Sequence, residues 1–198
     1  MASIDYSSRE INSRIVYFGP GLSGKTENLK VIQNKTVPPG ASALTLARDA
    51  ERTLFFDFLP LELGEINGFR ARFQLYTLPG RLFYEASRGM ILRDADGFVF
   101  VADSRFDRVG DNIECIEGVR ADLRGHQKNL SEIPYVVQYN KRDLPNVIPV
   151  AELKGVLNPE GVEDFEAVAS AGAGVLPTFK AIVRRVLMGL KGGGVKGS

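Results

Sequence analysis

A glycine-rich stretch, Gly19-Pro-Gly-Leu-Ser-Gly-Lys-Thr26, follows an apolar segment and limits the folds open to this chain. It fits the pattern G-x-x-x-x-G-K-[ST], in which backbone N–H groups cradle phosphates, the lysine neutralises them and the hydroxyl binds Mg²⁺. A glycine-rich turn with an incidental lysine is the alternative, but a strand before the loop and a helix after it argue against that. The pattern predicts nucleotide contacts from Gly19, Gly21, Leu22, Ser23, Gly24, Lys25, Thr26 and Glu27, with Thr26 also a metal ligand.

Apolar segments and turn signals along the chain predict strands alternating with helices. Strands are expected at 10–18, 97–103, 133–139 and 167–169, and helices from Gly24 onward and at 110–123 and 176–190. Segments 54–66 and 69–76 flank Asn67-Gly68, the strongest short hairpin signal, so they should be antiparallel neighbours. This order predicts an α/β fold with a mostly parallel central sheet, one antiparallel edge strand and helices on both faces.

Length and composition set the class of protein. The 198 residues suit a single domain, expected over residues 1–190, with a flexible Gly-rich tail at 191–198. A formal net charge of +1 gives no case for a nucleic-acid partner. A single cysteine, Cys115, excludes a disulfide framework within the chain and favours a reducing, cytoplasmic compartment. No apolar run is long enough to insert directly into a membrane.

The choice of base follows from Asn140-Lys-Arg-Asp143, which comes directly after an expected strand. Ligands of open α/β sheets bind at the carboxyl ends of the strands. The carboxylate of Asp143 can accept from the two N–H donors on the Watson–Crick edge of guanine, a pair that adenine does not offer. Asn140 can reach the N7 side of the purine, and the stem of Lys141 can cover the ring. A charged turn is the alternative for the isolated tetrapeptide.

Two further segments end strands near the expected site. Val168-Ala169-Ser170 could supply a backbone N–H to the guanine O6, although the segment alone carries no signal. Asp103 ends the central strand and could either bear on a ligand or act only as a cap.

The order of phosphate loop, Asn-Lys-x-Asp and Val-Ala-Ser resembles Ras-superfamily GTPases and, more closely, the MglA-type family of bacterial Ras-like GTPases. The resemblance spans residues 4–190 and is carried by segments 12–25, 51–61, 72–92, 97–104 and 133–144. It implies a Ras-like P-loop NTPase fold that cycles between GTP and GDP with Mg²⁺. It also implies a Roadblock-type MglB homodimer as activating partner, polarity or motility effectors, and recruitment to a cell pole by partners.

The resemblance assigns roles to residues beyond the phosphate loop. Thr53 would sense the γ-phosphate through Mg²⁺ as a second metal ligand, and Arg52 would be a built-in arginine finger, a device worth roughly 10³–10⁵ in rate. In 77–80, Ras proteins carry Asp-x-x-Gly, whereas this chain and the MglA type begin with threonine. Thr77 has no carboxylate for the water shell of Mg²⁺, but the N–H of Gly80 can still contact the γ-phosphate.

Two residues depart from the family pattern. Arg81 stands where the family has the glutamine that orients the attacking water, and a guanidinium cannot accept a hydrogen bond from that water. Glu27 places a carboxylate beside the phosphates, which is unfavourable unless it turns outward. The chain is therefore expected to be a slow GTPase or a guanine-nucleotide-binding module that hardly hydrolyses GTP. A generic P-loop ATPase is a distant third, opposed by Asp143.

Overall fold

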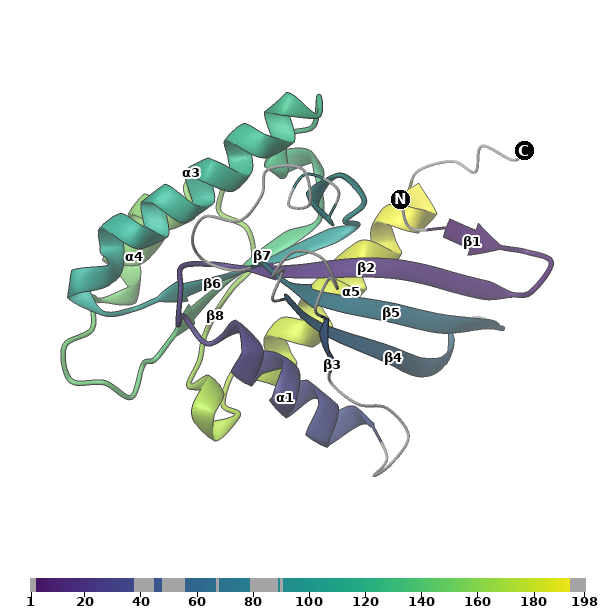
Figure 1. Ribbon diagram of the computed structural model, residues 1–198, viewed down its shortest axis with the longest axis horizontal. Helices are drawn as coiled ribbons and strands as arrows, with labels where there is room; N and C mark the ends of the chain where they lie inside the picture. Colours follow the sequence, from purple (N-terminus) through teal and green to yellow (C-terminus); the bar gives the residue numbers. More distant parts are fainter. Residues whose placement is uncertain are drawn as a thin grey trace.

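The computed structural model describes residues 3–37, 45–47, 56–66, 68–78, 89 and 91–192. Its centre is one eight-stranded sheet (Figure 1). Parallel pairing joins β5 to β2, β2 to β6, β6 to β7 and β7 to β8, whereas β3–β4, β4–β5 and β1–β2 are antiparallel. Across the sheet the strands are β3 (Thr45–Ala47), β4 (Phe56–Ile66), β5 (Phe69–Thr77), β2 (Glu10–Phe18), β6 (Gly97–Asp103), β7 (Tyr135–Asn140) and β8 (Asp164–Glu166), with β1 (Ser3–Asp5) beside β2.

Helices cover both faces of the sheet (Figure 1). α1 (Lys25–Thr36) and α5 (Val175–Gly192) bury one apolar cluster against the sheet, including Leu29 and Ile182. α3 (Val109–Gly125) and α4 (Val150–Leu157) bury the other, including Ile116 and Leu153. The described part of the chain also contains three single turns of 3₁₀ helix: η1 (Phe106–Arg108), η2 (Leu130–Glu132) and η3 (Ala169–Ala171). The predicted mostly parallel α/β fold is confirmed.

The structure corrects several local expectations. The last strand is 164–166 and not 167–169, because the chain leaves the sheet after Glu166 and residues 169–171 form η3. Between the phosphate-loop helix and the predicted hairpin, residues 45–47 form an additional strand, β3, which pairs with β4. α5 continues to Gly192, two residues into the expected tail, and residues 193–198 lie outside the described part of the chain.

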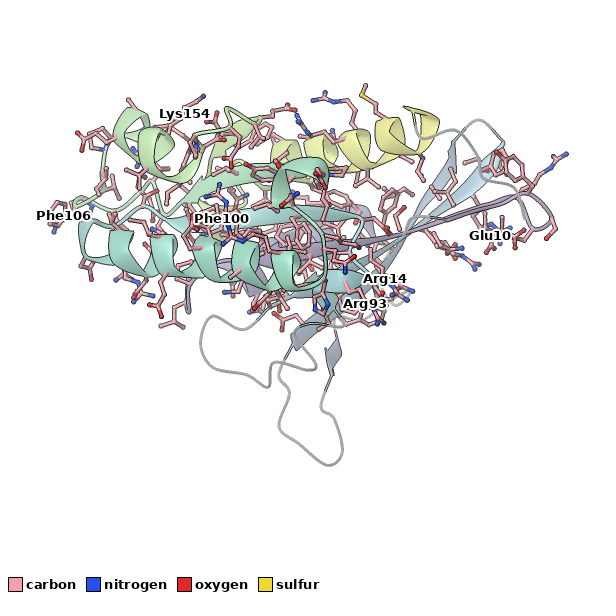
Figure 2. The ribbon with its side chains drawn as sticks, turned by 90° about the horizontal axis from the view of Figure 1, so that it is seen from above. Glu10, Arg14, Arg93, Phe100, Phe106 and Lys154 are labelled. Atoms are coloured by element: carbon pink, nitrogen blue, oxygen red, sulfur yellow. The ribbon has the colours of Figure 1, made fainter. Side chains whose placement is uncertain are left out.

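The topology brings the polar segments to one end of the sheet. The parallel strands β2, β6 and β7 run in the same direction and end at Phe18, Asp103 and Asn140. Figure 2 shows Phe100 in the middle of the molecule, Phe106 projecting at this end and Glu10 at the opposite end. The phosphate loop and Asn140–Asp143 therefore meet at a common edge, where α/β proteins hold their ligands. Within the described residues, no helix is both long and apolar enough to cross a membrane.

Candidate functional site

The phosphate loop is shaped by two glycines that no other residue could replace without strain. Gly19 and Gly24 have φ of 152° and 102°. A Cβ on Gly19 would lie 2.2 Å from the Val101 carbonyl oxygen, and one on Gly24 would lie 2.2 Å from the Asn140 side-chain nitrogen. The strand β6 and the segment 140–143, called here the base-recognition loop, thus lie directly against this turn. α1 begins at Lys25, so its positive N-terminal end faces the loop.

Lys25 is held inside the loop by the backbone. Its Nζ donates to the carbonyl oxygens of Gly19 and Pro20 at 2.9 and 2.8 Å. Burial lowers the pKa of Lys25 to about 8, although the nearby Asp57 and Cys115 partly oppose this shift. A phosphate entering the loop would offer this buried ammonium stronger, charged acceptors.

A carboxylate that sequence reasoning missed lies beside Thr26. Asp57 of β4 is buried, and its Oδ2 accepts hydrogen bonds from Thr26 Oγ1 at 2.5 Å and Thr77 Oγ1 at 3.0 Å. The Asp57 N–H donates back to Thr77 Oγ1 at 2.9 Å. Asp57 therefore places a carboxylate next to the threonine that stands where Ras proteins have aspartate. A hydroxyl oxygen and a carboxylate oxygen side by side are metal ligands of the kind that Mg²⁺ prefers, so this pair fits the metal.

Asn140 ties the base-recognition loop to the phosphate loop. Its Nδ2 donates to the Ser23 carbonyl at 2.7 Å, and its Oδ1 accepts from the Ala169 N–H at 2.9 Å. The side chain is buried. This brace between three segments distant in sequence was not foreseen, whereas contact between Asn140 and the purine N7 stays a prediction.

Two of the three backbone N–H groups in 168–170 that could reach a guanine O6 are used within the protein. The N–H of Val168 donates to the Ala173 carbonyl, and that of Ala169 is used by Asn140. Neither group is therefore available to a guanine O6. Ser170, the next residue, lines the base pocket. Of the three residues in the segment, the N–H of Ser170 is therefore the candidate donor to the guanine O6.

A pocket of about 320 Å³ adjoins the phosphate loop. Lys141 and Asp143 line it from the loop after β7, and Leu22 of the phosphate loop, whose side chain is exposed, also lines it. A larger hollow of about 740 Å³ lies between α1, α5 and the sheet, lined mostly by apolar side chains. We assign the nucleotide to the smaller pocket because it has the groups that recognise a base and phosphates. The lining residues are Leu22, Gly24, Glu27, Asn140, Lys141, Asp143, Leu144, Ala169 and Ser170.

Glu27 lines the pocket, but its carboxylate is paired within α1. Its Oε1 accepts from Lys30 Nζ at 2.7 Å one turn along α1, and both side chains are about half exposed to solvent. Solvent and the lysine screen this carboxylate from bound phosphates. We therefore expect Glu27 to weaken nucleotide binding only slightly.

Four residues singled out from the sequence lie outside the described part of the chain: Arg52, Thr53, Gly80 and Arg81. Their roles stay predictions. The described residues contain no group of three or more His, Cys, Asp or Glu side chains that could hold a metal. A magnesium ion at Thr26 and Asp57 would therefore rely on phosphate and water for its other ligands, as Mg²⁺ sites in nucleotide-binding proteins commonly do.

Comparison with known proteins gives one close relative of full length. The chain is 53% identical over 195 residues to the mutual gliding-motility protein MglA of Myxococcus xanthus (strain DK1622). The aligned region covers 98% of this chain and 100% of the relative. No family model matches the chain.

Proposed function

Because the chain belongs to the MglA family of small GTPases, we propose that it is a guanine-nucleotide switch that binds GTP and GDP with Mg²⁺ and hydrolyses GTP slowly. The proposal rests chiefly on Asn140, whose side chain bonds both Ser23 of the phosphate loop and Ala169. These bonds bring the groups expected to bind phosphates and the groups expected to bind the base to the same pocket. Loops ordered around the γ-phosphate and released after hydrolysis would form the switch.

Nucleotide binding would use each side of the pocket for a different part of the ligand. Lys25 and the N–H groups of Gly21 to Thr26 would surround the phosphates. Asp143 would accept from the guanine N1 and N2 groups, and the N–H of Ser170 would donate to O6. Adenine has an acceptor at N1 and an amino group at C6. Its N1 would face the acceptor oxygens of Asp143 and its amino group would face the N–H of Ser170, so neither pair could form a hydrogen bond.

The metal would sit beside Thr26, with Asp57 supplying the carboxylate to its water shell and Thr53 joining when the γ-phosphate is bound. Mg²⁺ would neutralise phosphate charge and orient the phosphates. The chain's own contribution is to hold the Thr26 hydroxyl and the Asp57 carboxylate together, with Thr77 donating to the same carboxylate oxygen.

Substitution Asp57→Asn tests this assignment. Removing the negative charge should weaken the hold on Mg²⁺, so that the acceleration of GDP release by a chelator shrinks about tenfold relative to the unchanged protein. Release of a labelled GDP with and without chelator measures the effect. Glu62→Gln, on the exposed part of the same strand, is the control and should retain the full effect of the chelator. An Asp57→Asn protein with an unreduced chelator effect would contradict the assignment.

Hydrolysis is proposed to be slow because Arg81 cannot accept a hydrogen bond from the attacking water. Arg52 would neutralise charge on the transferred phosphoryl group. Substitution Arg81→Gln is expected to raise the single-turnover rate of GTP hydrolysis by roughly 10–100-fold, because a glutamine can both accept from and donate to the water. Single-turnover assays compare the two proteins, and equal rates would show that residue 81 does not limit hydrolysis.

The alternative is a module that binds guanine nucleotide but hardly hydrolyses GTP, and Arg81 is the residue that favours it. A Roadblock-type MglB homodimer as activating partner distinguishes the two. Acceleration of GTP turnover by that dimer supports a switch in polarity or gliding motility, acting in the cytoplasm and recruited to a pole by partners. GTP retained without turnover in its presence supports the module.

A further inference from the structure

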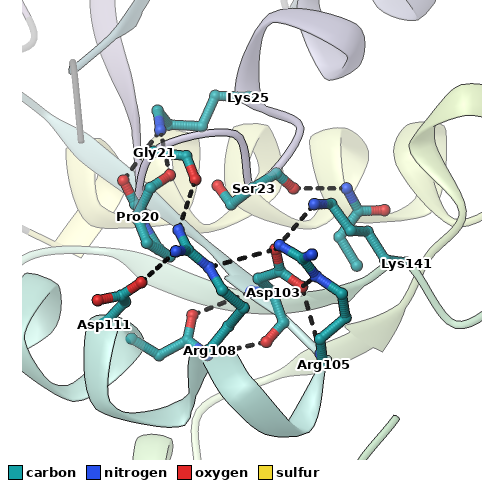
Figure 3. A network of polar contacts seen from close by, with 12 residues as sticks. Pro20, Gly21, Ser23, Lys25, Asp103, Arg105, Arg108, Asp111 and Lys141 are labelled. Atoms are coloured by element: carbon teal, nitrogen blue, oxygen red, sulfur yellow. Dashed lines mark hydrogen bonds and ion pairs between the residues drawn. The ribbon is translucent and has the colours of Figure 1, made fainter. Parts of the chain in front are cut away.

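A buried polar cluster behind the phosphate loop is not explained by the contacts above (Figure 3). The carboxylate of Asp103, at the end of β6, is fully buried. Its Oδ2 lies 2.8 Å from Lys141 Nζ, 3.0 Å from Arg105 Nη2 and 3.8 Å from Arg108 Nε. Burial raises the pKa of Asp103, but hydrogen bonds from Arg105 and Lys141 outweigh it and hold the pKa below its ordinary value. One ionised carboxylate thus gathers three cations.

Arg108 links this cluster to the phosphate loop. Its Nη2 donates to the Gly21 carbonyl at 2.8 Å, and its guanidinium also pairs with Asp111 one turn along α3. The backbone end of the cluster is fixed as well, since Asn112 of α3 exchanges two hydrogen bonds with the backbone of Asp103 at 2.9 and 2.8 Å. The guanidinium is therefore held on two sides by carboxylates and presents a donor to the loop.

The contact at Gly21 fixes the direction of a phosphate-binding group. In a trans peptide the C=O and the following N–H point to opposite sides. Holding the Gly21 carbonyl outward therefore points the Leu22 N–H into the loop. Leu22 needs this support, because its φ of 63° is a left-handed conformation that disfavours residues other than glycine. Asn140 holds the Ser23 carbonyl in the same way and so directs the Gly24 N–H.

We propose that Arg108 is a positioning residue for nucleotide phosphates: it clamps the Gly21 carbonyl, and Asp103 sets it in place together with Lys141 of the base-recognition loop. The two halves of the pocket are then coupled, because the carboxylate that orients the clamp also orients a base-binding lysine. This inference rests on the proposed function, since it concerns the same nucleotide.

The test compares Arg108→Gln, Arg108→Lys and the control Arg120→Gln. Arg120 lies on α3, which begins directly after Arg108, and it pairs with Glu117 and Glu160 and not with the phosphate loop. Loss of a hydrogen bond from a charged donor should speed the release of labelled GDP about tenfold in Arg108→Gln. Arg108→Lys retains the charge but cannot hold the loop and both carboxylates at once, so its rate should be intermediate. Arg120→Gln should release GDP at the unchanged rate.

A second readout separates positioning from folding stability. The ³¹P resonance of the β-phosphate of bound GDP should shift in the Arg108 variants and not in Arg120→Gln, because only the former reorient a phosphate-binding N–H. Release within twofold of the unchanged protein, or faster release with an unshifted ³¹P resonance and a lower urea midpoint, would overturn the inference. If Arg108→Gln does not fold, Arg108→Lys decides by the same criteria. Failure of the unchanged protein to bind GDP would instead refute the proposed function.

Discussion

Substitution Asp143→Asn is expected to lower the affinity for GDP by roughly 10²–10⁴, because two charge-assisted hydrogen bonds to guanine are lost. An amide can also donate, so the variant should gain affinity for xanthosine diphosphate, whose base has a carbonyl at the corresponding position. Competition of the two nucleotides against labelled GDP measures both changes. No other single substitution in the pocket should exchange one base preference for another.

The matched control for Asp143 is Glu166→Gln. Glu166 is also an exposed carboxylate near the loop, but it pairs with Arg142 and does not line the pocket. It should leave GDP affinity within about twofold, as surface substitutions generally do. An Asp143→Asn protein that binds GDP as tightly as the control would mean that another group reads the guanine edge.

Substitution Lys25→Met is expected to weaken GDP binding by roughly 10²–10³ through loss of a buried cation beside the phosphates. Equilibrium titration with labelled GDP measures the loss. The methionine side chain is close in length to the lysine stem, so the loop should keep its shape through the Asn140 and Arg108 contacts. Retention of full affinity would show that the backbone N–H groups alone bind the phosphates.

The pKa of Lys25 makes the same interaction dependent on pH. In the ligand-free protein this pKa is about 8, so the ammonium is mostly charged at pH 7 and mostly neutral at pH 9. Phosphates bind the charged form, and a proton must therefore be taken up on binding above pH 8. Affinity for GDP should fall roughly tenfold between pH 7 and pH 9. Lys25→Met is the control for ionisation of the guanine itself. Its weaker GDP binding should not show the tenfold fall between pH 7 and pH 9 that is due to Lys25.

The backbone of the site could be predicted from sequence because its signals are local. The strands at 10–18 and 97–103 are observed at the expected residues, since each contains an apolar run, 15–18 and 98–102, that is followed by glycine or a polar residue. The helix expected from Gly24 onward is observed as α1, Lys25–Thr36. The helix at 150–157 was not predicted, because eight residues span too few turns to show a clear period.

Asp57 could not be predicted because its position depends on a bulge in a non-local pairing. Ile66 pairs with Phe69 next to the turn. If the pairing continued from there without a bulge, Asp57 would lie opposite Leu78. The pairing shifts between Glu62 and Glu65, so that Phe58 pairs with Tyr76 and Asp57 lies beside Thr77. One residue of register decides which side chains share a face of the sheet. The only available signal was that Thr77 has no carboxylate for the water shell of Mg²⁺. This indicates that another residue supplies the carboxylate, but it does not show which one.

The contacts of Arg108 and Asn140 were hidden for a related reason. Each joins segments more than 80 residues apart, and each donates to a backbone carbonyl. Because every residue carries such a carbonyl, the identity of the acceptor residue gives no indication of the contact. The use of two N–H groups at 168–170 has the same origin, because the Asn140 side chain and the Ala173 carbonyl accept from two of the three N–H groups that could have reached the guanine O6.

Identification of the nucleotide that leaves the purified protein on denaturation tests the central claim most directly. Chromatography of the released material should show GDP or GTP in amounts approaching one per chain, and Asp143→Asn should reduce that amount. Adenine nucleotide in the same fraction, retained by the unchanged protein and unaffected by Asp143→Asn, would contradict the assignment of a guanine-nucleotide switch.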